Sequence, residues 1–244
     1  MASELKEGLV ARLRQVGAYE VRIANPTKGF EHAIAGQHPL KLWPACQSII
    51  VFAVAMSPTV NNTYVGVRAP SKKERNVGPV PENIESSEYA MDRLSRLFVA
   101  SITLKGMAYL VRRGHQVSFT NPQAKLSAFE AGLGVYGRSG LILHRELGNR
   151  MSIGTIMTDA EIEPDERLED FEPCAGCDLC VRECPAGAYD PEKKYPESFS
   201  RERCMAKRAE IGAEGLYCHN CFAVCPAGRL KDGELSCTRE ARSL

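Results

Sequence analysis

The chain has 244 residues, of which 44% are hydrophobic and 25% are charged, and its formal net charge is +1. This composition is that of an ordinary globular protein with one or two domains, and a near-neutral chain offers no electrostatic basis for general nucleic-acid binding. Because the N-terminus lacks a charged-then-apolar signal segment and no apolar run reaches membrane-spanning length, the sequence predicts a cytoplasmic protein with no nucleic-acid and no membrane partner.

The first elements expected along the chain are a helix and two strands. Apolar residues at helical spacing before Gly17 predict an amphipathic helix, and the alternation in residues 19–23 predicts a strand. Residues 25–44 are expected to be irregular. Residues 47–56 form a continuous apolar run, which predicts a buried central strand. Cys46, at the edge of that run, is expected to be a packed small hydrophobe.

The middle of the chain is expected to contain a long loop, a long helix and two short elements. Residues 57–81 are predicted to form a functional loop. A helix is predicted from residue 84 to 113, ended by Gly114, and a short strand and helix follow at 117–120 and 125–131. The apolar face of the long helix is predicted to consist of Tyr89, Leu94, Leu97, Phe98, Ile102, Leu104 and Leu110.

A glycine-rich segment follows, in which residues 132–140 read Gly-Leu-Gly-Val-Tyr-Gly-Arg-Ser-Gly. It matches the G-x-G-x-x-G pattern, but it follows a helix and leads into an extended stretch, which is the reverse of the dinucleotide-binding context. Its glycines permit close backbone approach to a flat or phosphate-bearing ligand. The alternative is a tight helix-to-strand turn.

The remaining apolar strand, at residues 150–157, leads into an acidic connector at 158–173. Strands mixed with long helices predict an α+β first domain. The expected division of the chain is therefore a first domain at 1–165 and a cysteine-rich second domain at 166–244.

Ten cysteines are present, and most of them lie in two runs near the C-terminus. The first run, from Cys174 to Cys184, has C-x2-C-x2-C-x3-C-P spacing. In bacterial ferredoxins three cysteines of this run hold one [4Fe-4S] cluster and the fourth ligates a second. The second run, from Cys218 to Cys225, repeats this order but lacks one cysteine, in whose place Gly215 stands.

Two clusters therefore need one more ligand from elsewhere in the chain. Cys204 is the nearest candidate and Cys237 the second. Exchange of ligands between the runs predicts one cluster on Cys174, Cys177, Cys180 and Cys225, and the other on Cys184, Cys204, Cys218 and Cys221. Zinc would favour two separated C-x2-C pairs, and disulfides are not expected in a chain without a secretory segment.

Several segments together resemble epoxyqueuosine reductase and its relatives. They are residues 44–52, residues 131–142, the Leu-Gly-Asn-Arg at 147–150, the Ile-Met-Thr-Asp at 156–159 and the two cysteine runs. The resemblance covers most of the chain from Pro44 onward. It implies a cobalamin-binding domain of flavin-nitroreductase-like fold followed by a ferredoxin-like domain with two [4Fe-4S] clusters, an arrangement shared with reductive dehalogenases.

The resemblance also implies a mechanism, in which the clusters pass electrons to cobalamin and the cobalt centre reduces an organic substrate. The chain departs from the family in several places. It stops at Leu244, where epoxyqueuosine reductases continue into a tRNA-binding repeat domain, and residues 117–122 lack the expected aspartate. Val135 and Arg138 stand where tryptophan and lysine are usual. Epoxyqueuosine in tRNA is therefore not the expected substrate.

The leading hypothesis is an iron–sulfur oxidoreductase that binds a corrinoid against Gly132, Gly134, Gly137 and Arg138. Tyr136 and Tyr89 are weak candidates for a proton donor, and a role as core aromatics is the favoured alternative. The expected partners are a low-potential electron donor such as flavodoxin or ferredoxin, and a small-molecule substrate or a partner corrinoid protein. Two alternatives remain: an electron carrier or corrinoid-reducing activator without its own cobalamin, and a protein that retains flavin.

Overall fold

The computed structural model describes residues 2–56, 84–118, 120, 122–213, 218, 220–231 and 234–236. The chain separates into two compact units that are interleaved in sequence. The first consists of Met1–Ala55, Ser95–Val135 and Met151–Phe171, and the second of Met56–Leu94, Tyr136–Arg150 and Glu172–Leu244. Residues 136–150 thus group with the cysteine runs, and the predicted division into domains at residue 165 stays a prediction. The predicted loop at 57–81 and Cys237 lie outside the described residues.

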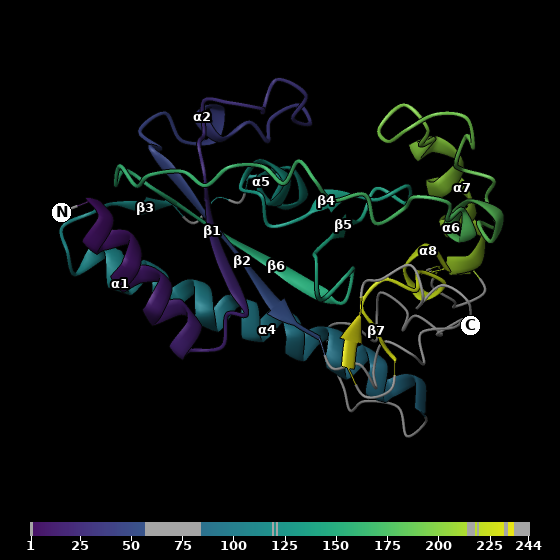
Figure 1. Ribbon diagram of the computed structural model, residues 1–244, viewed down its shortest axis with the longest axis horizontal. Helices are drawn as coiled ribbons and strands as arrows, with labels where there is room; N and C mark the ends of the chain where they lie inside the picture. Colours follow the sequence, from purple (N-terminus) through teal and green to yellow (C-terminus); the bar gives the residue numbers. More distant parts are fainter. Residues whose placement is uncertain are drawn as a thin grey trace. The chain divides into compact units, whose positions relative to one another are not determined.

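The first unit is built on a four-stranded antiparallel sheet (Figure 1). Its strands are β1 (Glu20–Ala24), β2 (Ser48–Ala55), β6 (Met151–Thr158) and β3 (Val117–Ser118), in the order β1-β2-β6-β3. All but the last residue of β2 are buried, as expected for a continuous apolar run that is covered on both faces. The predicted central strand is therefore confirmed.

Helices α1 (Ala2–Gln15) and α4 (Ile84–Val111) supply the core on one face of this sheet. At Gly106 helix α4 approaches both α1 and the sheet closely, because a Cβ added there would lie 2.5 Å from Ile156 Cδ1 and 2.9 Å from Leu13 Cδ2. Helix α5 (Ala124–Glu130) contacts β1, β2 and β6 and lies on the other side of the sheet from α1 (Figure 1). A short helix, α2 (Pro39–Leu42), interrupts the stretch predicted to be irregular.

The predicted apolar face of α4 is partly wrong. Ile102 and Leu110 are buried, whereas Leu97, Phe98 and Leu104 are at least half exposed. Apolar residues of α4 occur on several sides of the helix, so their spacing along the sequence does not decide which side faces the sheet. That choice is made by packing at Gly106. The side chains of residues 84–94, which include Tyr89, lie outside the described part of the structure.

The second unit contains short elements joined by turns. Strands β4 (Val135–Tyr136) and β5 (Ile142–Leu143) form one two-stranded sheet, and β7 (Arg229–Lys231) and β8 (Glu234–Ser236) form another. The helices that carry or precede the cysteines are α6 (Leu179–Arg182), α7 (Arg201–Ala213) and α8 (Asn220–Ala223). No helix in the described ranges is long and apolar enough to cross a membrane.

Candidate metal centre

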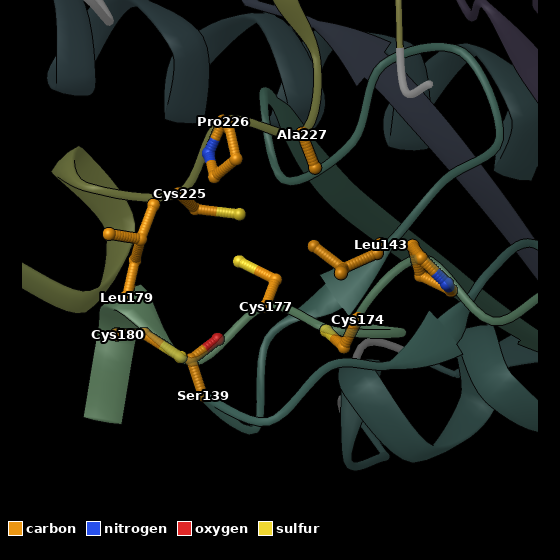
Figure 2. A pocket seen from close by; sticks show the side chains of 10 residues that line it. Ser139, Leu143, Cys174, Cys177, Leu179, Cys180, Cys225, Pro226 and Ala227 are labelled. Atoms are coloured by element: carbon orange, nitrogen blue, oxygen red, sulfur yellow. The ribbon is translucent and has the colours of Figure 1, made fainter. Parts of the chain in front are cut away.

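Four of the predicted ligands line one cavity in the second unit (Figure 2). Cys174, Cys177 and Cys180 come from the first cysteine run and Cys225 from the end of the second. The space between these side chains, counted together with the open solvent at its mouth, has a volume of about 440 Å³. The sulfur atoms of Cys177 and Cys225 point toward each other in Figure 2. The other residues that line it are Ser139, Leu143, Pro173, Leu179, Pro226 and Ala227.

Local backbone structure sets the direction of these thiols. The amide of Cys177 donates a hydrogen bond to the carbonyl oxygen of Cys174 at 3.1 Å, in a turn whose Gly176 has φ +69°. That φ favours glycine. Cys180 lies in α6, and Cys225 lies two residues after the end of α8. The spacing of the run therefore brings its first three cysteines around one side of the cavity.

The glycine-rich segment forms part of the wall of this cavity. The amide of Arg138 donates a hydrogen bond to Cys174 Sγ at 3.4 Å. A Cβ added at Gly137 would lie 2.8 Å from Leu143 Cδ1 and 3.4 Å from Cys174 Sγ, so only glycine leaves this space. Amide hydrogen bonds to sulfur and tight surrounding packing are features that stabilise and tune cluster thiolates.

The electrostatics of the cavity fit a cationic metal group. Burial raises the pKa of the Cys180 thiol to about 12, and the neighbouring Cys174, Cys225 and Cys177 contribute to the rise. Thiolates that lie this close together repel one another, so they form together only where cations replace the protons. Iron would supply that charge, and four cysteines are the number of ligands that a [4Fe-4S] cluster requires.

The other four predicted ligands are also in the second unit. Cys204 lies in α7. Burial raises the pKa of its thiol, and the nearby thiols of Cys184 and Cys218 add to the rise. The sulfur of Cys184 accepts a hydrogen bond from the amide of Ala188 at 3.5 Å. Cys204 therefore lies near Cys184 and Cys218, and its assignment to the second cluster stays a prediction.

Tyr189 lies beside thiols of both groups and was not identified from the sequence. Burial raises the pKa of its hydroxyl, and Cys221, Cys184 and Cys180 contribute. The hydroxyl also donates to the carbonyl oxygen of Ser139 at 3.2 Å. No motif marks this tyrosine, because its position becomes apparent only when the two cysteine runs are folded together.

Arg150 is a second residue that sequence reasoning missed as a site residue. It is 1% exposed, and its guanidinium donates to the carbonyl oxygens of Phe222 at 2.9 Å and Cys225 at 3.1 Å. It also lies 4.6 Å from the centre of the Phe222 ring. Arg150 therefore fixes the backbone of the second cysteine run against residues 136–150.

The residues predicted to line a cofactor are divided between the two units. Gly132, in the first, has φ +69° in the turn after α5, and a Cβ there would strike the carbonyl oxygen of Glu166. Gly134 is buried. Gly137 and Arg138 face Cys174, and the Arg138 guanidinium donates to the carbonyl oxygen of Pro191 at 3.4 Å. A tight helix-to-strand turn thus accounts for Gly132, and the corrinoid role of the four residues stays a prediction.

Tyr136 stacks on Tyr195, with ring centroids 4.9 Å apart and planes inclined by 26°. Tyr195 in turn packs against Gly140, where a Cβ would lie 2.4 Å from its ring. This arrangement is that of a packed aromatic, the alternative favoured by the sequence.

None of the cysteines that the structure describes, including the buried Cys46, forms a disulfide. Across the described ranges, no three His, Cys, Asp or Glu side chains form a group suited to one metal ion. A four-iron cluster is a larger body than a single ion, so the ligands of a cluster would lie around a cavity and not around one point.

Known proteins with related sequences are reductases of two kinds. A tetrachloroethene reductive dehalogenase from Desulfitobacterium hafniense is 30% identical over 147 residues, which are 52% of this chain and 26% of the dehalogenase. An epoxyqueuosine reductase from Listeria monocytogenes is 26% identical over 214 residues, which are 84% of this chain and 55% of that enzyme. No family model matches the chain.

Solved structures of both kinds share the fold. A catabolic reductive dehalogenase aligns with a TM-score of 0.68 at 19% identity over 97% of this chain and 32% of that one. Epoxyqueuosine reductase from Bacillus subtilis aligns with a TM-score of 0.56 at 18% identity, over 99% of this chain and 69% of that one. The chain is thus a mixed α/β homologue of epoxyqueuosine reductases and reductive dehalogenases, which confirms the resemblance. It spans about a quarter to about half the length of the two relatives named by sequence.

Proposed function

We propose that this protein is an iron–sulfur reductase with two [4Fe-4S] clusters, which passes electrons to a bound corrinoid for the reduction of a small organic substrate. The observation that carries the proposal is the cavity lined by Cys174, Cys177, Cys180 and Cys225. Homology to reductases of two kinds supports it, and B12-dependent dehalogenation is described for one solved neighbour. The clusters would supply one-electron transfer and the corrinoid the reduction of the substrate.

In this proposal the first unit is the flavin-nitroreductase-like, corrinoid-binding part and the second is the ferredoxin-like part. The chain's own residues do the positioning. The Arg138 amide and Gly137 hold the Cys174 sulfur in place, and Arg150 holds the Cys225 loop. Tyr189, beside cysteines of both groups, fills space between them and excludes water.

The second group is proposed to consist of Cys184, Cys204, Cys218 and Cys221. Its support is the proximity of Cys204 to Cys184 and Cys218. Replacing Cys204 by serine should remove about half of the iron, whereas Cys237→Ser should leave the iron content unchanged. Loss of a cluster in the Cys237 variant alone would contradict this ligand assignment.

An electron carrier or corrinoid-reducing activator without its own cobalamin is the second candidate. The contacts of Gly137 and Arg138 with Cys174 favour it, because they give these residues a role at the cysteines that needs no corrinoid. In the carrier the final acceptor would be a corrinoid on a partner protein.

One experiment tests the proposal and separates the two candidates. Anaerobically purified protein is analysed for iron and sulfide, and an absorbance titration with cobalamin follows. About eight iron atoms per chain and a saturable shift of the corrin bands are the expected results. The same iron content without a shift of the corrin bands would reject the cobalamin-binding reductase and favour the electron carrier. Absence of iron would reject both proposed functions. A bound flavin chromophore in the purified protein would support flavin in place of the corrinoid.

A further inference from the structure

We propose that the exposed surface of α7 around Cys204 docks a small, acidic electron-carrier protein of low reduction potential. This inference rests on the proposed function and deepens it, because it assigns the entry point of electrons to one helix. The α7 surface is defined by Arg201, Arg203, Cys204, Met205 and Arg208.

The first observation is the charge around Cys204. Arg201 lies three residues before it and Arg208 four residues after it, so the two cations flank the thiol one turn away on either side along the helix. Both act electrostatically on Cys204. Helix α7 also carries Glu202 and Glu210, but Glu210 is paired with Lys207 at 2.6 Å. The surface beside the thiol is therefore basic.

The second observation is an apolar side chain within this basic surface. Met205 directly follows Cys204 and is 48% exposed, one of few large hydrophobic side chains so exposed among the described residues. Methionine adapts its shape to different partners, and an apolar centre with a charged rim is the usual construction of a protein interface. A carrier seated on Met205 would lie next to a proposed cluster ligand.

The third observation is an open groove beside α7. Arg203, on its wall, donates from Nη1 to the carbonyl oxygen of Gly187 at 3.2 Å. The groove is lined by residues 187–191, residues 197–200 and Arg203.

These features point to an acidic redox protein as the occupant. Carboxylates on the carrier complement the arginines, steer the encounter and make its rate depend on salt. Interfaces of redox pairs are small, so a single helix face with one apolar contact is sufficient. In the encounter the reduced carrier loses one electron and this chain gains one. No covalent bond is made or broken and no proton moves.

The test measures binding by titration calorimetry of the iron-loaded protein with a reduced acidic flavodoxin and, separately, an acidic ferredoxin. The variant Arg201→Glu/Arg208→Glu should weaken binding about tenfold or more at low salt, and higher salt should weaken binding of the unmodified protein. Lys28→Glu/Lys41→Glu reverses two exposed charges in the first unit and should leave the affinity unchanged. Arg201→Gln/Arg208→Gln provides a milder change if the first variant does not fold.

Iron content and full reduction by dithionite serve as controls that are independent of docking. Absence of iron would reject the proposed function itself. Intact iron with equal carrier affinity in the α7 variants and the control, salt-independent binding, or no binding of either carrier would overturn the docking surface. Binding of flavodoxin alone, or of ferredoxin alone, would support it and identify the donor's class of cofactor.

Discussion

Arg150 Nη2 donates a hydrogen bond to the carbonyl oxygen of Cys225 at 3.1 Å, from a guanidinium that is almost completely buried. Its Nη1 donates to the Phe222 carbonyl oxygen at 2.9 Å and to Asn149 Oδ1 at 2.8 Å. A fixed positive charge therefore lies directly behind the loop that carries a proposed cluster ligand. Because the reduced cluster carries more negative charge than the oxidised one, this cation should favour reduction.

Replacing Arg150 by methionine removes the charge and leaves carbonyl oxygens without their donors. We expect the free energy of unfolding to fall by about 2–4 kcal/mol and the midpoint potential of one cluster to become more negative. Chemical denaturation and a redox titration monitored by EPR measure the two effects. Arg150→Lys keeps the charge and should shift the potential less, and the exposed Arg145→Met should change neither quantity. An unchanged potential in an iron-replete Arg150→Met protein would contradict the electrostatic role.

The tight packing at Gly137, in the wall of the cavity, gives a prediction about iron content. In Gly137→Ala the new methyl group would lie 2.8 Å from Leu143 Cδ1 and 3.4 Å from Cys174 Sγ. Overpacking of this kind costs about 1–3 kcal/mol and should displace the Cys174 thiol, so less iron is expected per chain. Ser139→Ala is the matched control, since it alters the adjacent wall residue without adding volume. Equal iron content in both variants would show that Gly137 does not constrain the ligand.

The long periodic elements of the fold were predictable from the sequence. The helix ending before Gly17, the apolar strand at 47–56 and the strand at 150–157 correspond closely to α1, β2 and β6. Which side of α4 faces the sheet was not predictable, because its exposed Leu97 and Leu104 are as apolar as the buried Ile102. The side that faces the sheet is the one on which Gly106 packs closely against Ile156 and Leu13.

The cavity was predictable only as far as local spacing reaches. Cys174, Cys177 and Cys180 lie within seven residues of one another, and the ligand order of ferredoxins predicts that Cys225 joins them. The contributions of Arg150 and Tyr189 depend on contacts with residues more than 30 positions away in the chain. No pattern in one sequence reports such contacts. The contact of the glycine-rich segment with Cys174 was not predicted, and the role of this segment toward a corrinoid stays a prediction.

Cys46 should differ from the proposed cluster ligands in the effect that its replacement has on iron content. It is 2% exposed, its thiol lies 3.5 Å from the carbonyl oxygen of Ser48, and burial raises its pKa to about 11. We expect no alkylation of Cys46 in the native protein at pH 8, because the thiolate is the reactive form. Cys46→Ala should retain all iron, whereas Cys180→Ser should lose about half of it. Iron loss in the Cys46 variant would show that this thiol has a role beyond packing.

Glu130 gives a prediction about pH and stability. Burial raises the pKa of its carboxyl above 4.5, although Arg167, which donates to Glu130 Oε2 from Nε at 2.7 Å, opposes the rise. The folded protein therefore holds this proton more tightly than the unfolded chain. The contribution of Glu130 to stability is fully present below pH 4.5 and is lost as the pH rises through the folded-state pKa.

The measurement is the free energy of unfolding from acidic to neutral pH. The Glu130→Gln variant has no carboxyl to ionise at this position, so it should not lose free energy of unfolding in this way. It should therefore gain stability relative to the unmodified protein as the pH rises above 4.5. Arg167→Met removes the opposing charge, so the loss should extend to higher pH. Glu163→Gln changes an exposed carboxylate nearby in the chain and should follow the unmodified protein. Parallel pH profiles for Glu130→Gln and the unmodified protein would show that the carboxyl titrates alike in the folded and unfolded states.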